Sequence, residues 1–187
     1  MGAATSDSDP IHNRPPVAQT FQVDSTGGVF TAVVNHFKSK SCGDATGADL
    51  DQGDGQGCYN ARQIAQAEAL LDFIDTLTAG EADDDVLVIG DLNSYGEEDP
   101  IQVLEEGELV VQLDIHLEGE PYSFIFDGMS GYLDHALASS SMSGQVNDAT
   151  EWHINADEPS VSTTTSSSSR RIYTRRRRIV LPTTTRW

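Results

Sequence analysis

The stretch VLVIGDLNSYGEEDP, residues 86–100, passes from a short apolar run directly into a glycine, a carboxylate and an amide. The run Val86–Ile89 is apolar at every position, which predicts a strand covered on both faces of a sheet. Gly90 then allows either a turn or the close approach of another backbone. Asp91 and Asn93 are two residues apart, so a continuing strand would point both side chains to one face. A carboxylate and an amide together suit a divalent cation, an attacking water and a phosphoryl group.

This stretch alone leaves two interpretations open, because Asp, Asn and Gly are also common in ordinary turns that follow strands. The sequence before it predicts a β-hairpin, with strands within residues 16–24 and 28–37 joined by a short turn. A helix is then predicted for residues 61–77, with Asn60 as its N-terminal cap. Apolar residues recur along it at helical spacing, namely Ile64, Leu70, Leu71, Ile74 and Leu77.

The sequence after the stretch predicts a second, shorter helix and further strands. The helix is expected to follow Pro100 and to pack through three apolar residues, Ile101, Val103 and Leu104. Residues 122–126 and 132–139 are expected to form another pair of strands, and residues 145–155 a further extended segment. Because a long helix separates pairs of strands, the predicted fold class is α/β, a mixed sheet with helices outside it.

Charge is distributed unevenly along the 187 residues. Residues 1–161 contain four of the 11 basic residues and all 30 acidic ones, a net charge of −26, whereas residues 162–187 contain seven arginines and no acid. A segment as acidic as residues 1–161 repels polyanions, which argues against a protein that coats nucleic acid in general. Any contact with nucleic acid would have to be made by a few basic residues or through a bound cation. No apolar run approaches the roughly 18–20 residues of a membrane span, and no protein partner is implied.

Cys42 and Cys58 flank a polar loop that is rich in glycine and aspartate, and their spacing does not match a metal-binding motif. We expect a disulfide between them, which would fit an oxidising compartment, although two reduced thiols are the alternative. The loop acids Asp49, Asp51 and Asp54 offer ligands for a structural Ca²⁺, but acids in glycine-rich loops are more often simply solvated.

Three further positions are candidates for chemistry. His36 ends an apolar strand close to Lys38 and Lys40, where an imidazole can donate to a phosphate oxygen or move a proton; a partly buried structural histidine is the plainer alternative. Asp134 lies within an apolar strand, and a buried carboxylate needs a partner, commonly a histidine that it orients. The histidine that follows Asp134 should face the other way. Arg14 is a candidate phosphate clamp, because guanidinium matches phosphate oxygens bidentately.

Five motifs occur in a fixed order, namely Arg-Pro-Pro from Arg14, Asn-His-Phe-Lys-Ser-Lys from Asn35, Asn-x-Arg-x-x-x-Gln-Ala from Asn60, Gly-Asp-Leu-Asn-Ser from Gly90 and Leu-Asp-His-Ala-Leu from Leu133. In this order and spacing, the sequence resembles the endonuclease/exonuclease/phosphatase superfamily from Asn13 to around Pro159. It is most similar to the secreted bacterial nucleases of that group, relatives of DNase I and exonuclease III. Within these motifs we interpret Asn60 and Arg62 as framework.

The resemblance implies part of a four-layer α/β/β/α sandwich, the DNase I-like fold, in which two mixed sheets pack face to face with helices outside. It also implies metal-dependent cleavage of phosphodiester bonds, with Mg²⁺ or Mn²⁺ as cofactor and nucleic acid as substrate. By position, Asp91 and Asn93 would hold the metal, the attacking water and the phosphate. His36 would contact the scissile phosphate, and Asp134 would orient the general-base histidine. Three basic side chains would bind the nucleic acid, namely Arg14, Lys38 and Lys40.

Two elements of the family pattern do not occur in this sequence: a metal-ligating glutamate on an early strand and a closing Ser-Asp-His-Asp-Pro-Val strand that supplies the base histidine. We therefore interpret residues 1–161 as a partial domain without its N-terminal half, from a secreted parent whose signal peptide is not in this chain. Residues 162–187 end in PTTTRW, which a one-base shift of the codons can convert to Asp-His-Asp-Pro-Val; a basic, disordered, nucleic-acid-binding tail is the alternative. As it stands, the fragment is expected to be poorly folded or inactive.

Three functions follow from these observations. The first is a secreted, metal-dependent DNA or RNA nuclease, which Arg14 and the lysines of HFKSK favour. The second keeps the fold and the site but changes the substrate, giving a phosphatase or a lipid phosphodiesterase. The third is an acidic, calcium-binding secreted module without catalysis, which would depend on the acids of the loop between Cys42 and Cys58.

Overall fold

The structure is a computed structural model that describes residues 14–79, 84–126, 128–153 and 156. The chain divides into two units, Met1–Asp157 and Glu158–Trp187, and all of the described residues belong to the first. The predicted basic tail at 162–187 lies outside the described residues, and so does the ending for which a frame shift is predicted.

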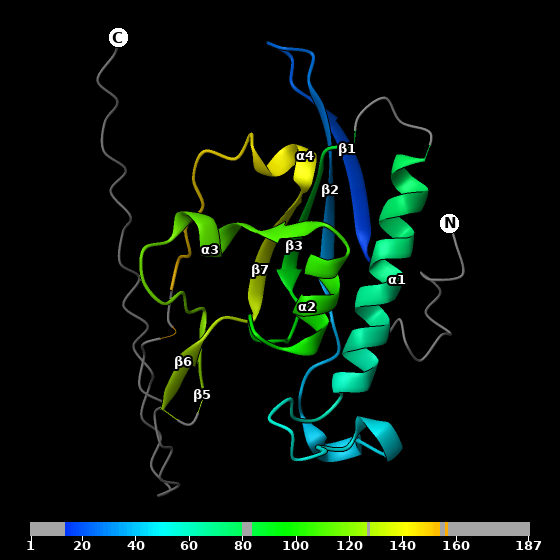
Figure 1. The fold of residues 1–187 in the computed structure, drawn as a ribbon, viewed down its shortest axis with the longest axis vertical. Coiled ribbons are helices and arrows are strands. Elements are labelled where there is room, and N and C mark those ends of the chain that lie inside the picture. The colour runs from blue at the N-terminus through cyan, green and yellow to red at the C-terminus, as the bar shows by residue number, and fades with distance from the viewer. Residues whose placement is uncertain (1–13, 80–83, 127, 154–155, 157–187) are drawn as a thin grey trace, which may run out of the picture. The chain divides into compact units, whose positions relative to one another are not determined.

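Five strands form one mixed sheet, in the order β1-β2-β3-β7-β4 (Figure 1). These are β1 (Val17–Gln22), β2 (Val29–His36), β3 (Val86–Asp91), β7 (Asp134–Ser139) and β4 (Leu109–Val111). Only β2 and β3 run parallel to each other, and every other neighbouring pair is antiparallel. The predicted hairpin, the strand after residue 85 and the mixed α/β class are confirmed.

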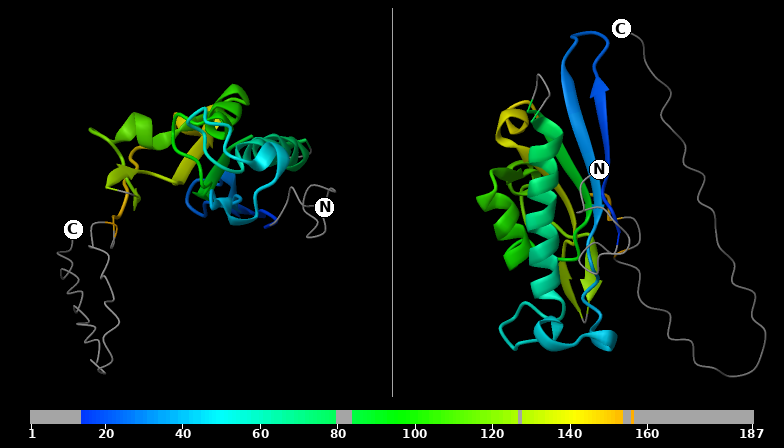
Figure 2. Two further views of the ribbon diagram at one scale, coloured as in Figure 1. Left: turned by 90° about the horizontal axis from the view of Figure 1, so that it is seen from below. Right: turned by 90° about the vertical axis from the view of Figure 1, so that its right-hand side faces the viewer.

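Helices cover one face of this sheet, as the right-hand view in Figure 2 shows. The long helix α1 (Asn60–Thr78) lies in the connection between β2 and β3, because parallel neighbours require such a crossover. The predicted second helix is α2 (Asp99–Glu106), which begins one residue before Pro100 and packs beside α1. Two short helices complete this part of the fold, namely α3 (Gln112–His116) and α4 (Ser140–Ser143).

The core lies between the helices and this covered face of the sheet. Val33, Val88 and Leu137 occupy neighbouring positions on three strands and are fully buried against the helices. Leu70 and Ile74 of α1 are buried in the same cluster, in agreement with the helical spacing seen in the sequence. Alternate residues of the strands therefore supply the apolar surface that holds the fold together.

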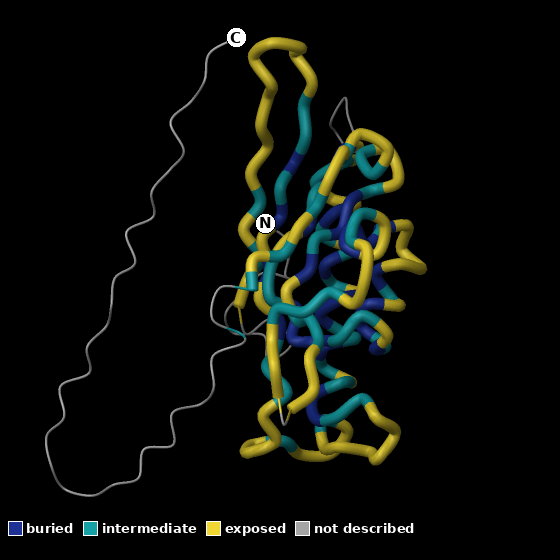
Figure 3. Tube along the Cα trace, turned by 90° about the vertical axis from the view of Figure 1, so that its left-hand side faces the viewer, coloured by how far each residue is buried: buried dark blue, intermediate teal, exposed yellow. Residues whose placement is uncertain are grey.

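The other face of the sheet is open. Val34 on β2 and Ile89 on β3 are partners in register, and they are 46% and 36% exposed. The prediction that the run ending at Ile89 is covered on both faces is therefore wrong, because the helices cover one face only. We call this surface the open face; its exposed and half-buried apolar residues are Val17, Phe21, Phe30, Ala32, Val34, Leu87, Ile89 and Ala136. The β1–β2 turn at the end of this face is also exposed (Figure 3).

Two predicted strand assignments are wrong. Residues 122–126 do not pair with residues 132–139, because β5 (Phe124–Phe126) folds back directly on β6 (Met129–Gly131) as a two-stranded hairpin. β7 instead enters the main sheet between β3 and β4, where Leu137 and Ala138 are buried. Residues 146–153 carry no regular secondary structure, so the extended segment predicted for 145–155 is not a strand within its described part.

The predicted capping role of Asn60 is also wrong. Tyr59 is the residue that precedes the helix, in a left-handed conformation with φ 67°, and Asn60 is the first helical residue. The Asn60 side chain instead donates from Nδ2 to Oδ2 of Asp99 at 2.7 Å, which joins the starts of α1 and α2. Among the described helices, none is long and apolar enough to cross a lipid bilayer.

Candidate functional site

Three of the predicted site residues lie side by side on three neighbouring strands. His36 at the end of β2 is the register partner of Asp91 at the end of β3, and Asp91 is the register partner of Asp134 at the start of β7. Partners in register project from the same face of a sheet. The His36–Asp91–Asp134 row therefore lies at one end of the open face, although the three residues are far apart in the sequence.

Asp91 is the central residue of the row. Its Oδ2 lies 3.4 Å from Nε2 of His36, which makes an ion pair when the histidine is protonated. Burial raises the pKa of Asp91, and the neighbouring Asp134 raises this pKa further; the backbone N–H of Asn93, His36 and Arg14 act in the opposite direction. The burial and the like charge dominate, so a cation placed between the two carboxylates would stabilise the ionised form.

Asn93 lies beside Asp91, but not as the next alternate residue of a continuing strand, which is what the sequence predicts. β3 ends at Asp91, and Asn93 adopts a left-handed conformation with φ 50°, so the two side chains do not project as alternate residues of one strand. The backbone N–H of Asn93 donates to Oδ1 of Asp91 at 2.9 Å, and its side-chain Nδ2 donates to the carbonyl oxygen of Phe37 at 3.1 Å. This leaves the amide oxygen of Asn93 as the atom available to a ligand.

Gly90 is required by a close approach of two backbones, the second of the interpretations that the sequence left open. Its φ is +138°, and a Cβ atom at this position would lie 2.0 Å from the carbonyl oxygen of Asn35. The absence of a side chain lets β2 and β3 run together immediately before the row, so this glycine determines how closely His36 and Asp91 approach.

Asp134 and His135 face opposite sides of β7. Asp134 is exposed, so the predicted burial of this carboxylate is wrong; it begins the strand at the rim of the open face. His135 is buried on the covered face, where its Nε2 lies 2.7 Å from the carbonyl oxygen of Ser94, and burial lowers its pKa. His135 is therefore not the histidine that Asp134 would orient, as the alternation along the strand predicts.

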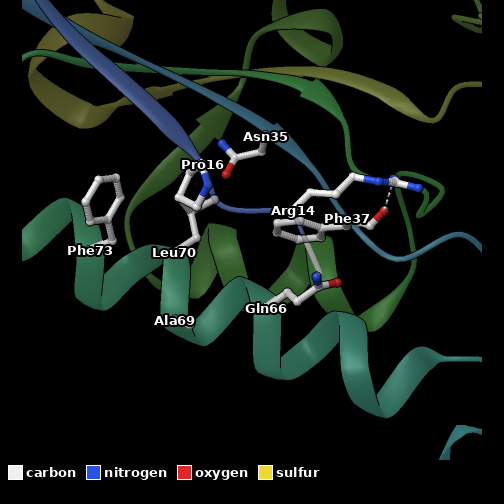
Figure 4. Close-up of a pocket in the computed structure, with 8 residues that line it drawn as sticks. All are labelled: Arg14, Pro16, Asn35, Phe37, Gln66, Ala69, Leu70 and Phe73. Atoms are coloured by element: carbon white, nitrogen blue, oxygen red, sulfur yellow. Dashed lines mark hydrogen bonds between the residues drawn. The ribbon is translucent and has the colours of Figure 1, made fainter. Parts of the chain in front are cut away.

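The basic residues are held in different ways. Arg14 donates from Nη1 to the carbonyl oxygen of Phe37 at 3.1 Å, at a pocket that also includes residues of α1 (Figure 4). Lys38 places its ammonium 3.9 Å from the centre of the Tyr59 ring. Lys40 forms a 2.6 Å ion pair with the buried carboxylate of Glu98. Arg14 and Asn93 both donate to the carbonyl oxygen of Phe37. The phosphate-binding roles of Arg14, Lys38 and Lys40 remain predictions.

The loop between β2 and α1 is tied to the rest of the fold. A disulfide joins Cys42 to Cys58, with their Cα atoms 5.4 Å apart. Asp49 pairs with Arg62 at 2.8 Å, consistent with a framework role for this arginine, while Asp51 and Asp54 each accept a backbone N–H two residues further on. The three acids do not converge, and the described residues contain no group of three or more His, Cys, Asp or Glu side chains arranged for a metal, so the calcium site is not found there.

Two glutamines of α1 position the site; Gln66 is the glutamine of the motif that begins at Asn60, and neither Gln63 nor Gln66 has a role predicted from the sequence. Gln63 is fully buried, and its Nε2 donates to the carbonyl oxygens of Lys38 at 2.7 Å and Asn93 at 2.9 Å. Gln66 accepts the backbone N–H of Lys38 at 2.9 Å. One helix thus connects the loops that follow β2 and β3. Two amides three residues apart on an otherwise apolar helix face are the signal that could have indicated this role.

The row and Asn93 supply part of a coordination shell for a hard divalent cation, although the row is not a complete metal-binding group among the described residues. Asp91 and Asp134 supply carboxylate oxygens, and Asn93 supplies an amide oxygen, which are ligands that Mg²⁺ and Mn²⁺ prefer. Asp91 and Asp134 are partners in register, and two neighbouring carboxylates favour a bound positive charge; burial and this like charge both raise the pKa of Asp91. The remaining ligands would come from water, from the phosphate or from groups outside the described residues.

No protein-family model matches the sequence, and no curated protein matches it. Among solved structures, an endonuclease/exonuclease/phosphatase family protein from Bacteroides thetaiotaomicron matches 67% of this chain and 42% of its own, with a TM-score of 0.50 and 14% identity. Sphingomyelinase C from Streptomyces griseocarneus matches 69% of this chain and 43% of its own, with a TM-score of 0.50 and 21% identity. The chain spans less than half the length of both. Its described residues therefore have part of the α/β fold of the endonuclease/exonuclease/phosphatase proteins.

Proposed function

We propose that the chain carries part of the active site of a metal-dependent phosphodiesterase, which as a complete domain is an extracellular nuclease acting on DNA or RNA. The observation that supports this most strongly is the His36–Asp91–Asp134 row, in which three separate segments place an imidazole and two carboxylates in register. The disulfide between Cys42 and Cys58 supports an oxidising compartment, such as the outside of the cell.

Each side chain of the site has a part in the proposed reaction. Asp91, Asp134 and the amide oxygen of Asn93 would hold the cation, which when bound neutralises charge on the phosphate and on the leaving oxygen. His36 would donate a hydrogen bond to a non-bridging phosphate oxygen, and Asp91 keeps the imidazole in place. Arg14 and Asn93 donate to the same carbonyl oxygen, that of Phe37, so Arg14 lies near the site. Arg14 would hold a neighbouring phosphate.

The attacking water must lose a proton, and the row alone does not provide a separate base for it. Of the four described histidines, only His36 lies in the row. His36 would already donate to the phosphate, so we infer that the base comes from a part of the domain outside the described residues. On this proposal the chain binds metal and phosphate but hydrolyses slowly, because proton removal is the missing step.

We further propose that residues 1–161 are one part of a two-sheet domain. The support is the open face, on which Val34 and Ile89 are exposed beside the His36–Asp91–Asp134 row. An apolar sheet face of this kind is stable in water only when another layer covers it. A second sheet on this face would enclose the row between two layers and could add the missing ligands and the base.

The same row would also serve a phosphatase or a lipid phosphodiesterase, because these reactions break the same kind of phosphorus–oxygen bond. One similar structure carries the name of such an enzyme, a sphingomyelinase. Comparing supercoiled plasmid, a phosphomonoester and sphingomyelin vesicles as substrates separates the three. The proposal predicts that any residual hydrolysis is of the plasmid.

The decisive experiment measures metal binding and hydrolysis in the same samples. We expect the chain to bind Mn²⁺, detected by the loss of the free-ion electron paramagnetic resonance signal, and Asp91→Asn or Asp134→Asn to weaken this binding. Asp72→Asn, which changes an exposed acid on α1, is the control and should leave Mn²⁺ binding unaltered. Plasmid nicking with Mg²⁺ should be weak.

Two results would contradict the proposal. Mn²⁺ binding that is unchanged in both Asp91→Asn and Asp134→Asn would show that the row is not a metal site. Robust plasmid nicking that disappears in Asp91→Asn would show that the chain contains its own base, and the inferred missing half would then be unnecessary.

A further inference from the structure

A cleft of about 570 Å³ lies beside the proposed phosphate site. Its walls come from four parts of the chain: the loop between β2 and α1, which carries the Cys42–Cys58 disulfide, the segment after β3, strand β5, and Leu133 before β7. Asn93 lines this cleft and also donates its backbone N–H to Asp91 of the row. The cleft therefore continues from the residues that would hold the scissile phosphate, and a volume of this size accommodates a nucleoside.

Two phenylalanines with nearly parallel rings line one wall of the cleft. Phe124 and Phe126 are alternate residues of β5 and both line the cleft, with ring centres 6.2 Å apart and ring planes 13° apart. They are 42% and 63% exposed, and Ile125 between them is also exposed, so this short strand does not bury its side chains in a core. Exposed aromatic rings that line a concave site are typical of ligand binding.

The polar groups of the cleft indicate which ligand it suits. The hydroxyl groups of Ser39 and Ser41 can exchange hydrogen bonds with the edge of a heterocycle. Lys40 also lines the cleft, but its ammonium is paired with Glu98 at 2.6 Å. Asp51 adds a negative charge to the same wall. The cleft therefore disfavours a second phosphate and favours a flat, uncharged, hydrogen-bonding group.

We propose that Phe124 and Phe126 form a stacking platform for an unpaired nucleobase of the substrate strand, next to the phosphate that is cleaved. This inference rests on the proposed function and names the substrate class, which is single-stranded or locally unpaired nucleic acid. A base within a duplex is stacked on its neighbours and cannot also lie on the phenylalanine rings. Stacking also supplies affinity that the acidic body cannot gain from the phosphate backbone.

The test is a binding measurement on the full chain in EDTA, so that no hydrolysis takes place. The probes are a fluorescein-labelled ten-residue oligothymidylate, a labelled hairpin duplex and phosphatidylcholine vesicles. Phe124→Leu and Phe126→Leu keep an apolar side chain but remove the flat ring, and each should weaken oligothymidylate binding by roughly five- to a hundredfold. Phe126→Trp should keep the wild-type affinity for oligothymidylate, since indole is also a flat ring.

Phe21→Leu is the matched control. Phe21 is 48% exposed and stacks on Phe30 with ring centres 5.4 Å apart, but it lies on the open face and does not line the cleft. Its replacement should leave oligothymidylate binding within a factor of two of the wild-type value. All variants contain the arginine-rich residues 162–187, so any affinity from that segment is common to them.

Three results would overturn the stacking platform. The first is an oligothymidylate affinity that is unchanged in both Phe124→Leu and Phe126→Leu. The second is an equal loss of affinity for the hairpin duplex. The third is a loss of vesicle binding without a loss of oligothymidylate binding, which would make the β5–β6 hairpin of the protein a lipid contact. Binding in EDTA is independent of the metal, so failure of the proposed hydrolase shows in Mn²⁺ binding and plasmid nicking, whereas failure of the platform shows only here.

Discussion

The two faces of the five-stranded sheet are made by alternate residues of the same strands, yet the helices bury only one of them. Val33 and Val34 are neighbours on β2; the first is fully buried in the apolar core, and the second is 46% exposed. The covered face holds the apolar cluster that stabilises the fold, and the open face ends in the His36–Asp91–Asp134 row. Stability and the proposed chemistry thus depend on opposite sides of the same strands.

The largest effect is expected where the backbones of β2 and β3 approach each other. Gly90→Ala would place a Cβ atom 2.0 Å from the carbonyl oxygen of Asn35 at a φ of +138°, and no flexible side chain can relieve this contact. We expect a loss of more than about 4 kcal/mol in the free energy of unfolding, which removes the cooperative transition in urea.

Gly144→Ala is the control for this substitution, because a Cβ atom there meets nothing within 4 Å. Its free energy of unfolding should stay within about 0.5 kcal/mol of the wild-type value. A Gly90→Ala protein that unfolds cooperatively at the wild-type urea concentration would show that the register of the row does not depend on this close approach.

A smaller change in the free energy of unfolding should distinguish the covered face from the open face. Val33→Ala removes two buried methyl groups and should lower the free energy of unfolding by about 2 kcal/mol, whereas Val34→Ala should lower it by less than about 0.5 kcal/mol. Urea denaturation of both variants measures the difference. Equal losses at the two positions would mean that the open face is covered in solution, for example by a second copy of the chain, and the comparison of the faces would then be wrong.

The smallest effect concerns charge at the rim of the open face. Burial and the nearby Asp134 raise the pKa of Asp91 above its ordinary value of 3.8, so folding favours the protonated form of this carboxyl group. The ionised carboxylate therefore lowers stability at neutral pH, and this penalty disappears as the pH falls below 3.8. Asp91→Asn should accordingly melt at a higher temperature than the wild type at pH 7 and at the same temperature at pH 3.5.

Circular-dichroism melting curves at several pH values, in the absence of divalent cations, provide this measurement. Asp72→Asn on α1 serves as the control, since it removes an acid that lies outside the row. An Asp91→Asn variant that melts below the wild type at pH 7 would indicate that the ion pair with His36 outweighs the burial of the carboxylate.

Local patterns in the sequence were sufficient for much of the covered face. The helical spacing of Leu70 and Ile74 predicted the buried side of α1, and the apolar run from Val86 predicted a strand. The prediction failed where pairing between distant segments decides the result, as for β7, which enters the main sheet instead of pairing with residues 122–126. Strand partners depend on which other strands compete for the same hydrogen bonds, and no short stretch of sequence contains that information.

The candidate site shows the same division. The sequence indicated His36, Asp91, Asn93 and Asp134 because of their residue types at the ends of apolar runs, and the structure brings the three strand residues together. The sequence argument for Asn93 failed, because its left-handed backbone is stabilised by the bonds that it makes to Asp91 and Phe37. Gln63 was missed for a related reason: its partners are backbone carbonyls of loops that meet only in the folded chain.

By itself, the sequence determined the α/β class, the main helix and the β1–β2 hairpin, and it indicated the polar residues of the candidate site, because periodicity and residue chemistry are local properties. Only the tertiary structure decided that His36, Asp91 and Asp134 share one row, that the helices cover a single face, and that Phe124 and Phe126 line a cleft with Asn93. Those features depend on strand register and on layer packing, which join residues that are far apart along the chain.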